Sequence, residues 1–200
     1  NLENNLQPTQ IAKLSSNIIN KINKKETLRG EYEMLKLNLW DDLPASLDEV
    51  LNITKITSDS QAIIGNDVSE YNIKQWSRNG ELAKYKILHF ATHSFTNSDI
   101  PELSALVLSQ GIQDDEDGYL NINEISQLKL DADLINLSAC NTGIGKLYHG
   151  VGVMSISQSF FIAGTKALTL SLWYLADQST SLFMEEMYKN LNLEFSAVSS

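Results

Sequence analysis

Cys140 is the only cysteine of this 200-residue chain, and it closely follows a short, mostly apolar run. That run, residues 132–137, is typical of a strand that is buried on both faces. A second run of the same character, residues 85–91, is closely followed by His93. Open α/β sheets place their reactive groups past the carboxyl ends of such strands. If both strands lie in one parallel sheet, the thiol and the imidazole emerge at the same edge, as a nucleophile and its base require.

The chemistry that this pair suggests is attack of a thiolate on a carbonyl carbon. A cysteine reacts only as the thiolate, and imidazole can take the proton near neutral pH and return it to a leaving amine. His93 and Cys140 are 140 − 93 = 47 positions apart. A lone cysteine at a strand end is also often a small buried hydrophobic residue, so the spacing alone leaves both interpretations open.

Two other histidines compete for the role of base. His89 lies inside the strand 85–91, and alternation gives it the same face as His93. Its position favours a residue of the core, or one that supports the site. His149 lies in a glycine-bounded turn beyond the cysteine, where an ordinary loop residue and a residue at the rim of the site are both possible.

The elements that would position these residues alternate between helix and strand. Strands are predicted at residues 85–91, 103–108, 132–137 and 166–172, and helices at residues 11–25, 45–53, 66–79, 121–128, 150–163 and 177–191. This alternation predicts an α/β fold, a three-layer α/β/α sandwich with a mostly parallel central sheet. Asn121 with Glu124 reads as a capping pair. The apolar face of the predicted helix 150–163 is expected to include Phe160 and Phe161, and that of the helix 177–191 to include Leu182 and Phe183.

The chain divides near residue 42. Residues 1–42 are predicted to be an N-terminal helical extension or linker, and residues 43–200 the main domain. The pattern of residues 26–42 fits either a helix or a strand pair. The first residue is Asn1 rather than Met, which indicates a piece of a longer protein.

Composition narrows the possible partners. The formal net charge of −10 argues against a nucleic-acid surface, and we expect no direct nucleic-acid binding by this domain. A single cysteine cannot form an internal disulfide, which favours a reducing, cytoplasmic setting. No membrane span or signal peptide is evident. The acidic stretch 109–118 lacks the ligand spacing of a calcium loop, so a solvated turn is favoured and neither metal nor cofactor is expected.

Five blocks of this sequence, in order, resemble the CHAT domain, a caspase-like family of clan CD cysteine peptidases often found after TPR repeats. The blocks are residues 87–93 (ILHFATH), 103–108 (LSALVL), 133–143 (DLINLSACNTG), 150–164 (GVGVMSISQSFFIAG) and 171–177 (SLWYLAD). The resemblance implies a caspase-like fold, and the histidine of caspases likewise lies about 50 residues before the cysteine.

The same resemblance implies roles for individual residues. His93 would be the general base and Cys140 the nucleophile, and the backbone N–H groups of Cys140 and Ser94 would stabilise the oxyanion. The family usually has glycine where Ser94 stands, and serine adopts unusual backbone conformations less readily. This difference bears on the oxyanion geometry rather than on the dyad.

The block at residues 171–177 resembles the motif that closes the substrate pocket. Trp173 would shape a pocket wall, and Asp177 could bind a basic side chain at the cleavage position. Two consecutive acids are usual where Ala176 and Asp177 stand, and an arginine is common where Gln158 stands. A cap on the last helix is the other interpretation of Asp177.

The function implied is that of a cysteine endopeptidase that cleaves a protein or peptide partner, in bacterial signalling or defence. A regulatory sensor region, such as TPR repeats, would lie outside this piece. The alternative is a catalytically idle caspase-like scaffold that binds a protein partner. The presence of both His93 and Cys140 favours the enzyme.

Overall fold

The computed structural model describes residues 7–24, 26–35, 37, 40–97, 99–110, 116–138, 151–170 and 177–198, with the backbone alone at 151–155, 177 and 192–198. The helices are α1 (Pro8–Lys24), α2 (Arg29–Met34), α3 (Pro44–Ile56), α4 (Glu70–Arg78), α5 (Ile122–Ser126), α6 (Val151–Ala163) and α7 (Asp177–Val198). The strands are β1 (Ile87–Phe90), β2 (Ser94–Phe95), β3 (Ala105–Val107), β4 (Tyr119–Asn121), β5 (Leu134–Leu137) and β6 (Leu168–Leu170). Short 3₁₀ turns are η1 (Gly65–Asp67), η2 (Leu82–Lys84) and η3 (Pro101–Leu103).

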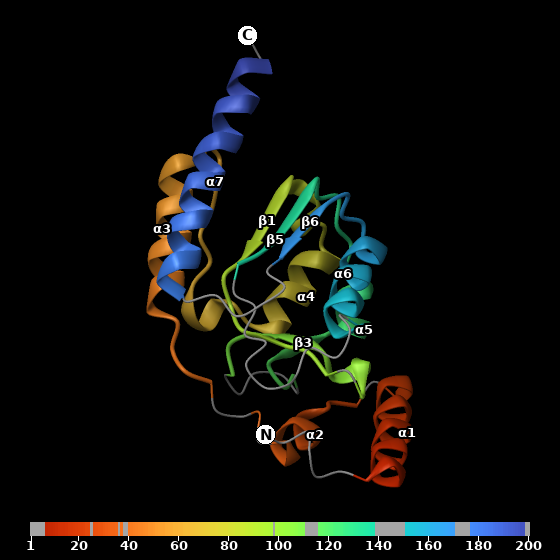
Figure 1. Cartoon of the computed structure of the whole chain (residues 1–200). Helices are drawn as coiled ribbons and strands as arrows, with labels where there is room; N and C mark the ends of the chain where they lie inside the picture. Colours follow the sequence, from red (N-terminus) through yellow and green to blue (C-terminus); the bar gives the residue numbers. More distant parts are fainter. Residues whose placement is uncertain are drawn as a thin grey trace.

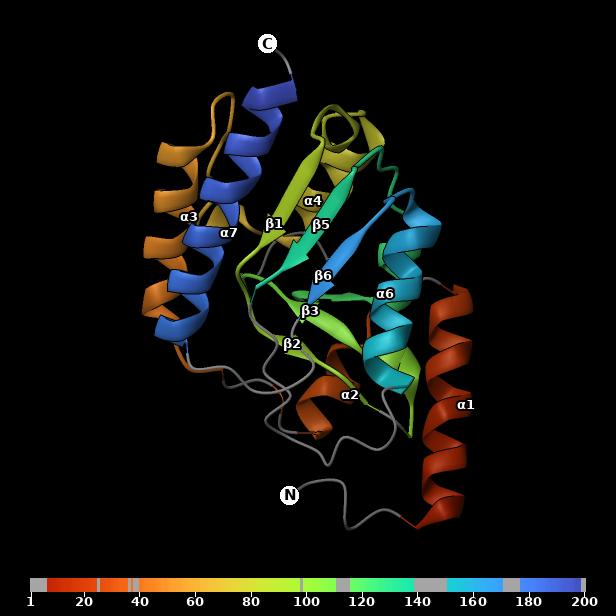
Figure 2. The same ribbon diagram turned by 45° about the horizontal axis from the view of Figure 1, so that its top comes forward.

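The central sheet is parallel, with the strand order β1-β5-β6. Helices α3 and α7 cover one face, and α4, α5 and α6 cover the other (Figures 1 and 2). Leu88, Phe90 and Ile135 face the core beneath α4, α5 and α6, whereas Ile87 faces α3 and α7. The alternation expected of strands that are covered on both sides is therefore present. The predicted three-layer sandwich with its parallel sheet is confirmed.

A second, antiparallel sheet with the order β2-β3-β4 lies beyond the carboxyl ends of β1 and β5 (Figures 1 and 2). Strand β2 lies between the predicted strands 85–91 and 103–108, where no strand was predicted. In β3, Leu106 faces the main core, whereas Ala105 and Val107 face the N-terminal helices. The second sheet thus separates the main core from a smaller one.

Helices α1 and α2 supply the other side of that smaller core. Its residues are Ile18, Leu28, Tyr32, Leu37, Phe95, Ile100, Leu103, Ala105, Val107 and Tyr119. Of the two structures that the sequence allowed for residues 26–42, the described part contains the helix α2. The boundary at residue 42 stays a prediction, but side chains from both sides of it pack into one cluster.

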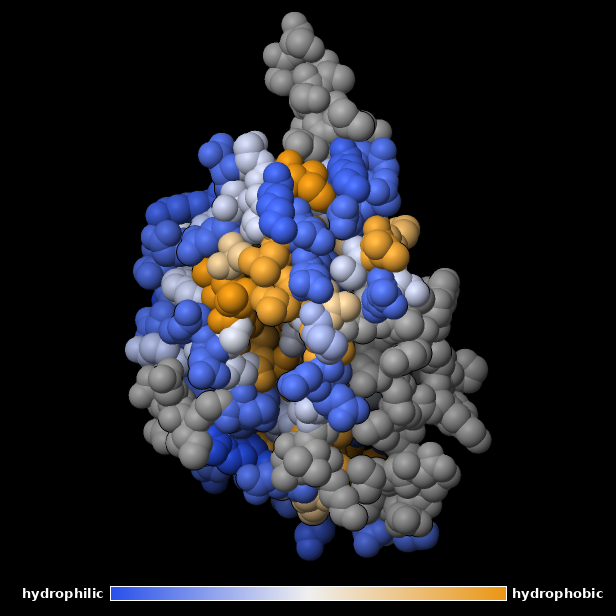
Figure 3. All heavy atoms as spheres, turned by 90° about the vertical axis from the view of Figure 1, so that its left-hand side faces the viewer, coloured by the Kyte–Doolittle hydropathy of each residue, from blue (hydrophilic) through white to orange (hydrophobic). Residues whose placement is uncertain are grey.

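Two of the predicted apolar helix faces are wrong in detail. In α7, Leu182 and Phe183 are 63% and 62% exposed, and the apolar side chains that are buried among its described residues are Met184 and Tyr188. In α6, Phe161 is likewise exposed. Where apolar residues are adjacent, periodicity does not decide which one faces inward, and the packing of α7 against α3 and β1 does. Figure 3 shows hydrophobic residues among hydrophilic ones on the outer face of α3 and α7.

Helices α4 and α5 each begin with a side-chain cap. Asn121 and Glu124 form the predicted capping box at α5, in which each side chain accepts from the other residue's backbone N–H. At α4 the capping side chain is Ser69, which accepts from the N–H of Asn72.

Gly164 permits the tight turn from α6 into β6. Its φ of +112° lies in a region that residues with a Cβ rarely adopt, and a Cβ there would lie 2.4 Å from the carbonyl oxygen of Leu130. That backbone is held in place, because Leu130 N–H donates to the carbonyl of Ala163 at 2.9 Å. Only glycine therefore fits without a backbone shift.

We expect Gly164→Ala to destabilise the fold by more than about 2 kcal/mol, because strain and a backbone clash add. Gly80→Ala is the matched variant with positive φ and open space, and should cost about 1–2 kcal/mol. Gly30→Ala, within α2 and with no contact nearby, should be neutral or stabilising. Urea unfolding measures all three. Equal losses of unfolding free energy in Gly80→Ala and Gly164→Ala would show that the clash with the Leu130 carbonyl costs nothing.

Candidate functional site

His93 lies where the chain passes from the parallel sheet to the antiparallel sheet. Strand β1 ends at Phe90, and its carbonyl accepts a hydrogen bond from Ser138 N–H, just past the end of β5, at 2.9 Å. Three residues after Phe90, the carbonyl of His93 accepts from Val107 N–H at 2.9 Å. The Thr92 hydroxyl donates to the carbonyl of Val107. These bonds fix the main chain on both sides of the histidine.

The imidazole of His93 is held by residues that the sequence assigned to the extension. Its Nε2 lies 2.7 Å from the carbonyl oxygen of Asp41, and its ring packs against that of Trp40 with 5.1 Å between centroids. A carbonyl can only accept, so Nε2 carries the proton. The other nitrogen, Nδ1, is buried and has no hydrogen-bond partner among the described residues. In neutral His93, Nδ1 is therefore the nitrogen with a lone pair that can accept a proton.

Ser94 begins β2 and is buried. It lies opposite Leu106 of β3 in the antiparallel ladder. Because His93 and Val107 form a hydrogen-bonded pair, the next pair along an antiparallel ladder is not hydrogen-bonded. The N–H of Ser94 is therefore directed away from β3. This is the orientation required of a backbone donor that serves a bound group.

The remaining predicted site residues are only partly covered. Cys140, Trp173 and His149 lie outside the described residues. Asp177 is the first residue of α7, and its side chain is not described. Strand β5 runs parallel and adjacent to β1 and ends three residues before Cys140. The two predicted strands thus end at the same edge of the sheet, as expected. That the Cys140 thiol lies close to the His93 imidazole stays a prediction.

His89 is a residue of the interior with its own partners. Its Nε2 lies 2.7 Å from a carboxylate oxygen of Glu49 on α3, and its Nδ1 lies 3.0 Å from Asn136 Nδ2 on β5. Thr169 of β6 donates to the Asn136 carbonyl at 2.5 Å. With Nδ1 accepting from Asn136, Nε2 carries the proton and donates to Glu49. A polar row thus crosses all three strands of the parallel sheet at one level.

This polar row faces α3 and α7, and it is buried at Glu49 and Asn136 but exposed at its end on β6, at Thr169. Glu49 is 2% exposed and Asn136 is fully buried. The hydroxyl of Tyr188 also lies 3.2 Å from Nδ1 of His89. Burial raises the pKa of Tyr188 to about 12, and the nearby Glu49 carboxylate adds to the rise. His89 therefore belongs to a network of largely buried side chains, whose described partners differ from those of His93.

One comparison with known proteins identifies the family. The model of the CHAT domain matches residues 6–198, which is nearly the whole chain. The chain belongs to the CHAT domain family. This is the caspase-like cysteine peptidase family whose motifs the sequence resembles, so the predicted resemblance is confirmed. No curated protein and no solved structure matches the chain significantly. No described helix of this CHAT domain is long and apolar enough to cross a membrane.

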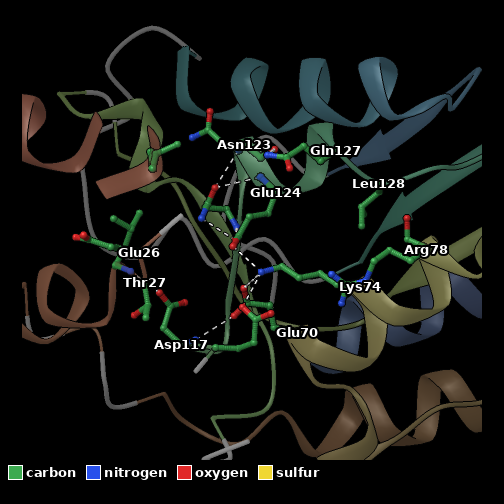
Figure 4. A pocket seen from close by; sticks show the side chains of 15 residues that line it. Glu26, Thr27, Glu70, Lys74, Arg78, Asp117, Asn123, Glu124, Gln127 and Leu128 are labelled. Atoms are coloured by element: carbon green, nitrogen blue, oxygen red, sulfur yellow. Dashed lines mark hydrogen bonds and ion pairs between the residues drawn. The ribbon is translucent and has the colours of Figure 1, made fainter. Parts of the chain in front are cut away.

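The CHAT domain also contains a partly buried cluster of charges that the sequence did not predict. Lys74 Nζ lies 2.5 Å from Glu70, 2.7 Å from Glu116 and 2.7 Å from Glu124. These groups line a cavity of about 370 Å³ between α4, α5 and residues 26–28, and Figure 4 shows Lys74 reaching into the carboxylates. The carboxylates come within 4.8 Å of one another, as metal ligands do, but the ammonium lies among them. Lys74 therefore supplies the positive charge of this cluster.

The cluster holds more negative than positive charge, and its pKa values reflect this. Burial and the nearby Glu124 raise the pKa of Glu70 to about 10 and that of Asp117 to about 6. Burial lowers the pKa of Lys74, but the Glu124 and Glu70 carboxylates outweigh it, so the pKa is raised overall. The acidic stretch 109–118 was expected to be a solvated turn. At residues 116 and 117 it is not simply solvated, because Glu116 pairs with Lys74 and Asp117 is buried.

Three features of the structure were missed in the sequence, and only one of them had left a signal there. Trp40 and Asp41 lie in a stretch of ambiguous periodicity, and a backbone carbonyl leaves no trace in residue type. Asn136 offered one signal, because a polar residue inside a buried strand needs partners. Lys74 lies 42 positions before Glu116, so only the fold brings their charges together.

We expect Glu124→Gln to flatten the pH dependence of stability between pH 5 and 8. Because their pKa values are raised in the native state, protonated Asp117 and Glu70 contribute stability below their unfolded pKa values of about 4. This contribution is lost as the pH rises through about 6 for Asp117 and about 10 for Glu70. Glutamine keeps the capping box and removes the charge that, after burial, contributes most to raising the pKa values of Glu70 and Asp117. Relative to wild type, the variant should gain stability with pH, by up to about 1.4 kcal/mol per pH unit for each proton.

The measurement is urea unfolding at several pH values. Glu185→Gln is the control, since it removes one charge from an ion pair with Lys189 outside the cluster. Its difference from wild type should stay constant over this range. Parallel stability curves for wild type and Glu124→Gln would show that the Glu124 charge does not raise these pKa values.

Proposed function

We propose that this CHAT domain is a cysteine endopeptidase in which His93 is the general base and Cys140 is the nucleophile. The observation that carries the proposal is the hydrogen bond from His93 Nε2 to the Asp41 carbonyl. It selects the tautomer whose Nδ1 can accept a proton. The parallel pairing of β1 and β5 and membership of a cysteine peptidase family support the same assignment.

The proposed reaction has two stages. Nδ1 of His93 takes the thiol proton of Cys140, and the sulfur attacks the scissile carbonyl carbon. The N–H groups of Ser94 and Cys140 stabilise the resulting oxyanion. His93 then gives its proton to the leaving amine, and an acyl-enzyme remains. Water, deprotonated by the same histidine, hydrolyses the thioester and restores the thiol.

The proposal includes the substrate and its setting. A protein or peptide partner supplies the scissile bond, Trp173 shapes the pocket, and the Asp177 carboxylate binds a basic side chain at the cleavage position. We place the activity in cytoplasmic bacterial signalling or defence, under a sensor region such as TPR repeats. No nucleic acid is expected to bind this domain directly, because the chain has a net charge of −10.

A second function has one observation in its favour. The side chain of His93 is covered, with the residue only 8% exposed, and Trp40 packs on its ring. A catalytically idle scaffold that binds a protein partner would tolerate a covered imidazole, whereas a peptidase needs a substrate to reach the reacting atoms. The two functions differ in whether His93 activates Cys140.

Thiol labelling separates these functions, because Cys140 is the only cysteine. For a peptidase we expect iodoacetamide to label Cys140 at pH 7 at least about tenfold faster in wild type than in His93→Ala, because the base generates the thiolate. His149→Ala is the control for loss of an imidazole and should label like wild type. Mass spectrometry measures the rates.

A peptide-library cleavage profile, with Cys140→Ala as the blank, then tests the reaction itself. Cleavage after basic residues that is lost in Cys140→Ala and in His93→Ala is the expected result. Equal, slow labelling of wild type and His93→Ala, together with no cysteine-dependent cleavage, would favour the scaffold.

A further inference from the structure

Residues 40 and 41 contact the imidazole of His93 on two sides. The Asp41 carbonyl binds the Nε2 edge at 2.7 Å, and the indole of Trp40 packs against the ring at an interplanar angle of 35°. A backbone carbonyl can hold a ring nitrogen only if the main chain at that position is itself fixed. Trp40, the residue before Asp41 in the chain, is anchored by hydrogen bonds next to the histidine.

Trp40 is anchored to the interior by its indole nitrogen. Nε1 donates to the hydroxyl of Tyr119 on β4 at 2.9 Å and to the carbonyl of Leu37 at 2.8 Å. The Tyr119 hydroxyl donates in turn to the carbonyl of Leu37. Tyr119 is stacked on Tyr32 of α2 with 3.9 Å between ring centroids, and both tyrosines are buried. The aromatic chain Tyr32–Tyr119–Trp40 thus runs from the N-terminal helices to His93.

The N-terminal segment is docked on the same sheet by polar contacts as well. Leu28 N–H donates to the Asp117 carboxylate at 2.8 Å, and Arg29 donates to the carbonyl of Glu116. Tyr32 donates to the carbonyl of Leu103 at 3.2 Å. These bonds attach the stretch before Trp40 to the β3–β4 hairpin and to η3. The position of residues 40 and 41 therefore depends on docking that occurs away from the histidine.

We propose that Trp40 is a positioning residue for His93, and that docking of the N-terminal helices through Tyr32 and Tyr119 holds the imidazole in its Nε2–H tautomer. The catalytic meaning of this proposal rests on the function proposed above. Without the indole, the ring of His93 can turn about its side-chain bonds and the Asp41 carbonyl can move away. Because a misplacement of about 1 Å can cost about 100-fold in rate, the effect on turnover is large even though Trp40 touches no substrate.

The test compares Trp40→Leu with Trp76→Leu in the full chain. Trp76 is also partly buried but packs in the main core, away from residues 40 and 41, so its loss controls for general destabilisation. ¹⁵N correlation spectra of the imidazoles report the tautomer directly, and His93→Gln assigns the signals. Wild type should show His93 with its proton on Nε2. Trp40→Leu should give a mixture of tautomers for His93 and leave the signals of His89 unchanged.

Kinetics supplies the second readout. Trp40→Leu should lower kcat about tenfold or more and change KM less than about twofold, whereas Trp76→Leu should change neither beyond about twofold. Tyr119→Phe, which keeps the stack and removes the hydroxyl that binds Trp40, should give an intermediate loss of kcat.

The outcomes separate this proposal from the proposed function. A tautomer mixture in Trp40→Leu, in a protein with no peptidase activity, would support the positioning role and reject the peptidase. An active wild type with an unchanged His93 tautomer and unchanged kcat in Trp40→Leu would overturn the positioning role and leave the peptidase intact. Equal changes in the Trp40→Leu and Trp76→Leu variants would likewise overturn it, because they would show only general loosening.

Discussion

Parallel pairing of β1 with β5 is the constraint on which the rest of the structure depends. The register sets Phe90 opposite Leu137, so both strands end at the same level. Parallel neighbours cannot be joined by a tight turn and need a long crossover. Here that crossover contains the antiparallel sheet and α5. The first residues of the crossover carry His93, and the extra sheet beyond the strand ends gives the N-terminal helices a surface to cover.

Much of this arrangement could be predicted from residue patterns. Buried strands read as apolar runs because both faces exclude water, and the predicted segments 85–91 and 132–137 contain β1 and β5. The capping box could also be predicted from the sequence, because its two residues, Asn121 and Glu124, are only three positions apart. Predictions of this kind succeed where the interaction is local or where burial alone determines residue type.

The contacts around His93 could not be predicted, for a specific physical reason. The acceptor on Asp41 is a main-chain carbonyl, which almost any residue would provide, so selection leaves no side-chain signature there. The inward residues of α7 show a related difficulty. Leu182 and Met184 are both apolar, and the neighbouring helix decides which of them is buried. The charge cluster at Lys74 depends on long-range assembly in the same way.

The polar row from Glu49 through His89 and Asn136 to Thr169 has a consequence for how the chain assembles. Apolar strands of four residues can pair in several alignments at similar cost. A shift of β5 by one residue would turn the Asn136 side chain into the apolar core beneath α6 and would leave the His89 imidazole without its hydrogen-bond donor. Each polar group left without a partner would cost about 1–3 kcal/mol. These hydrogen bonds therefore favour the native register, in which β1 and β5 end at the same level, over registers shifted by one residue.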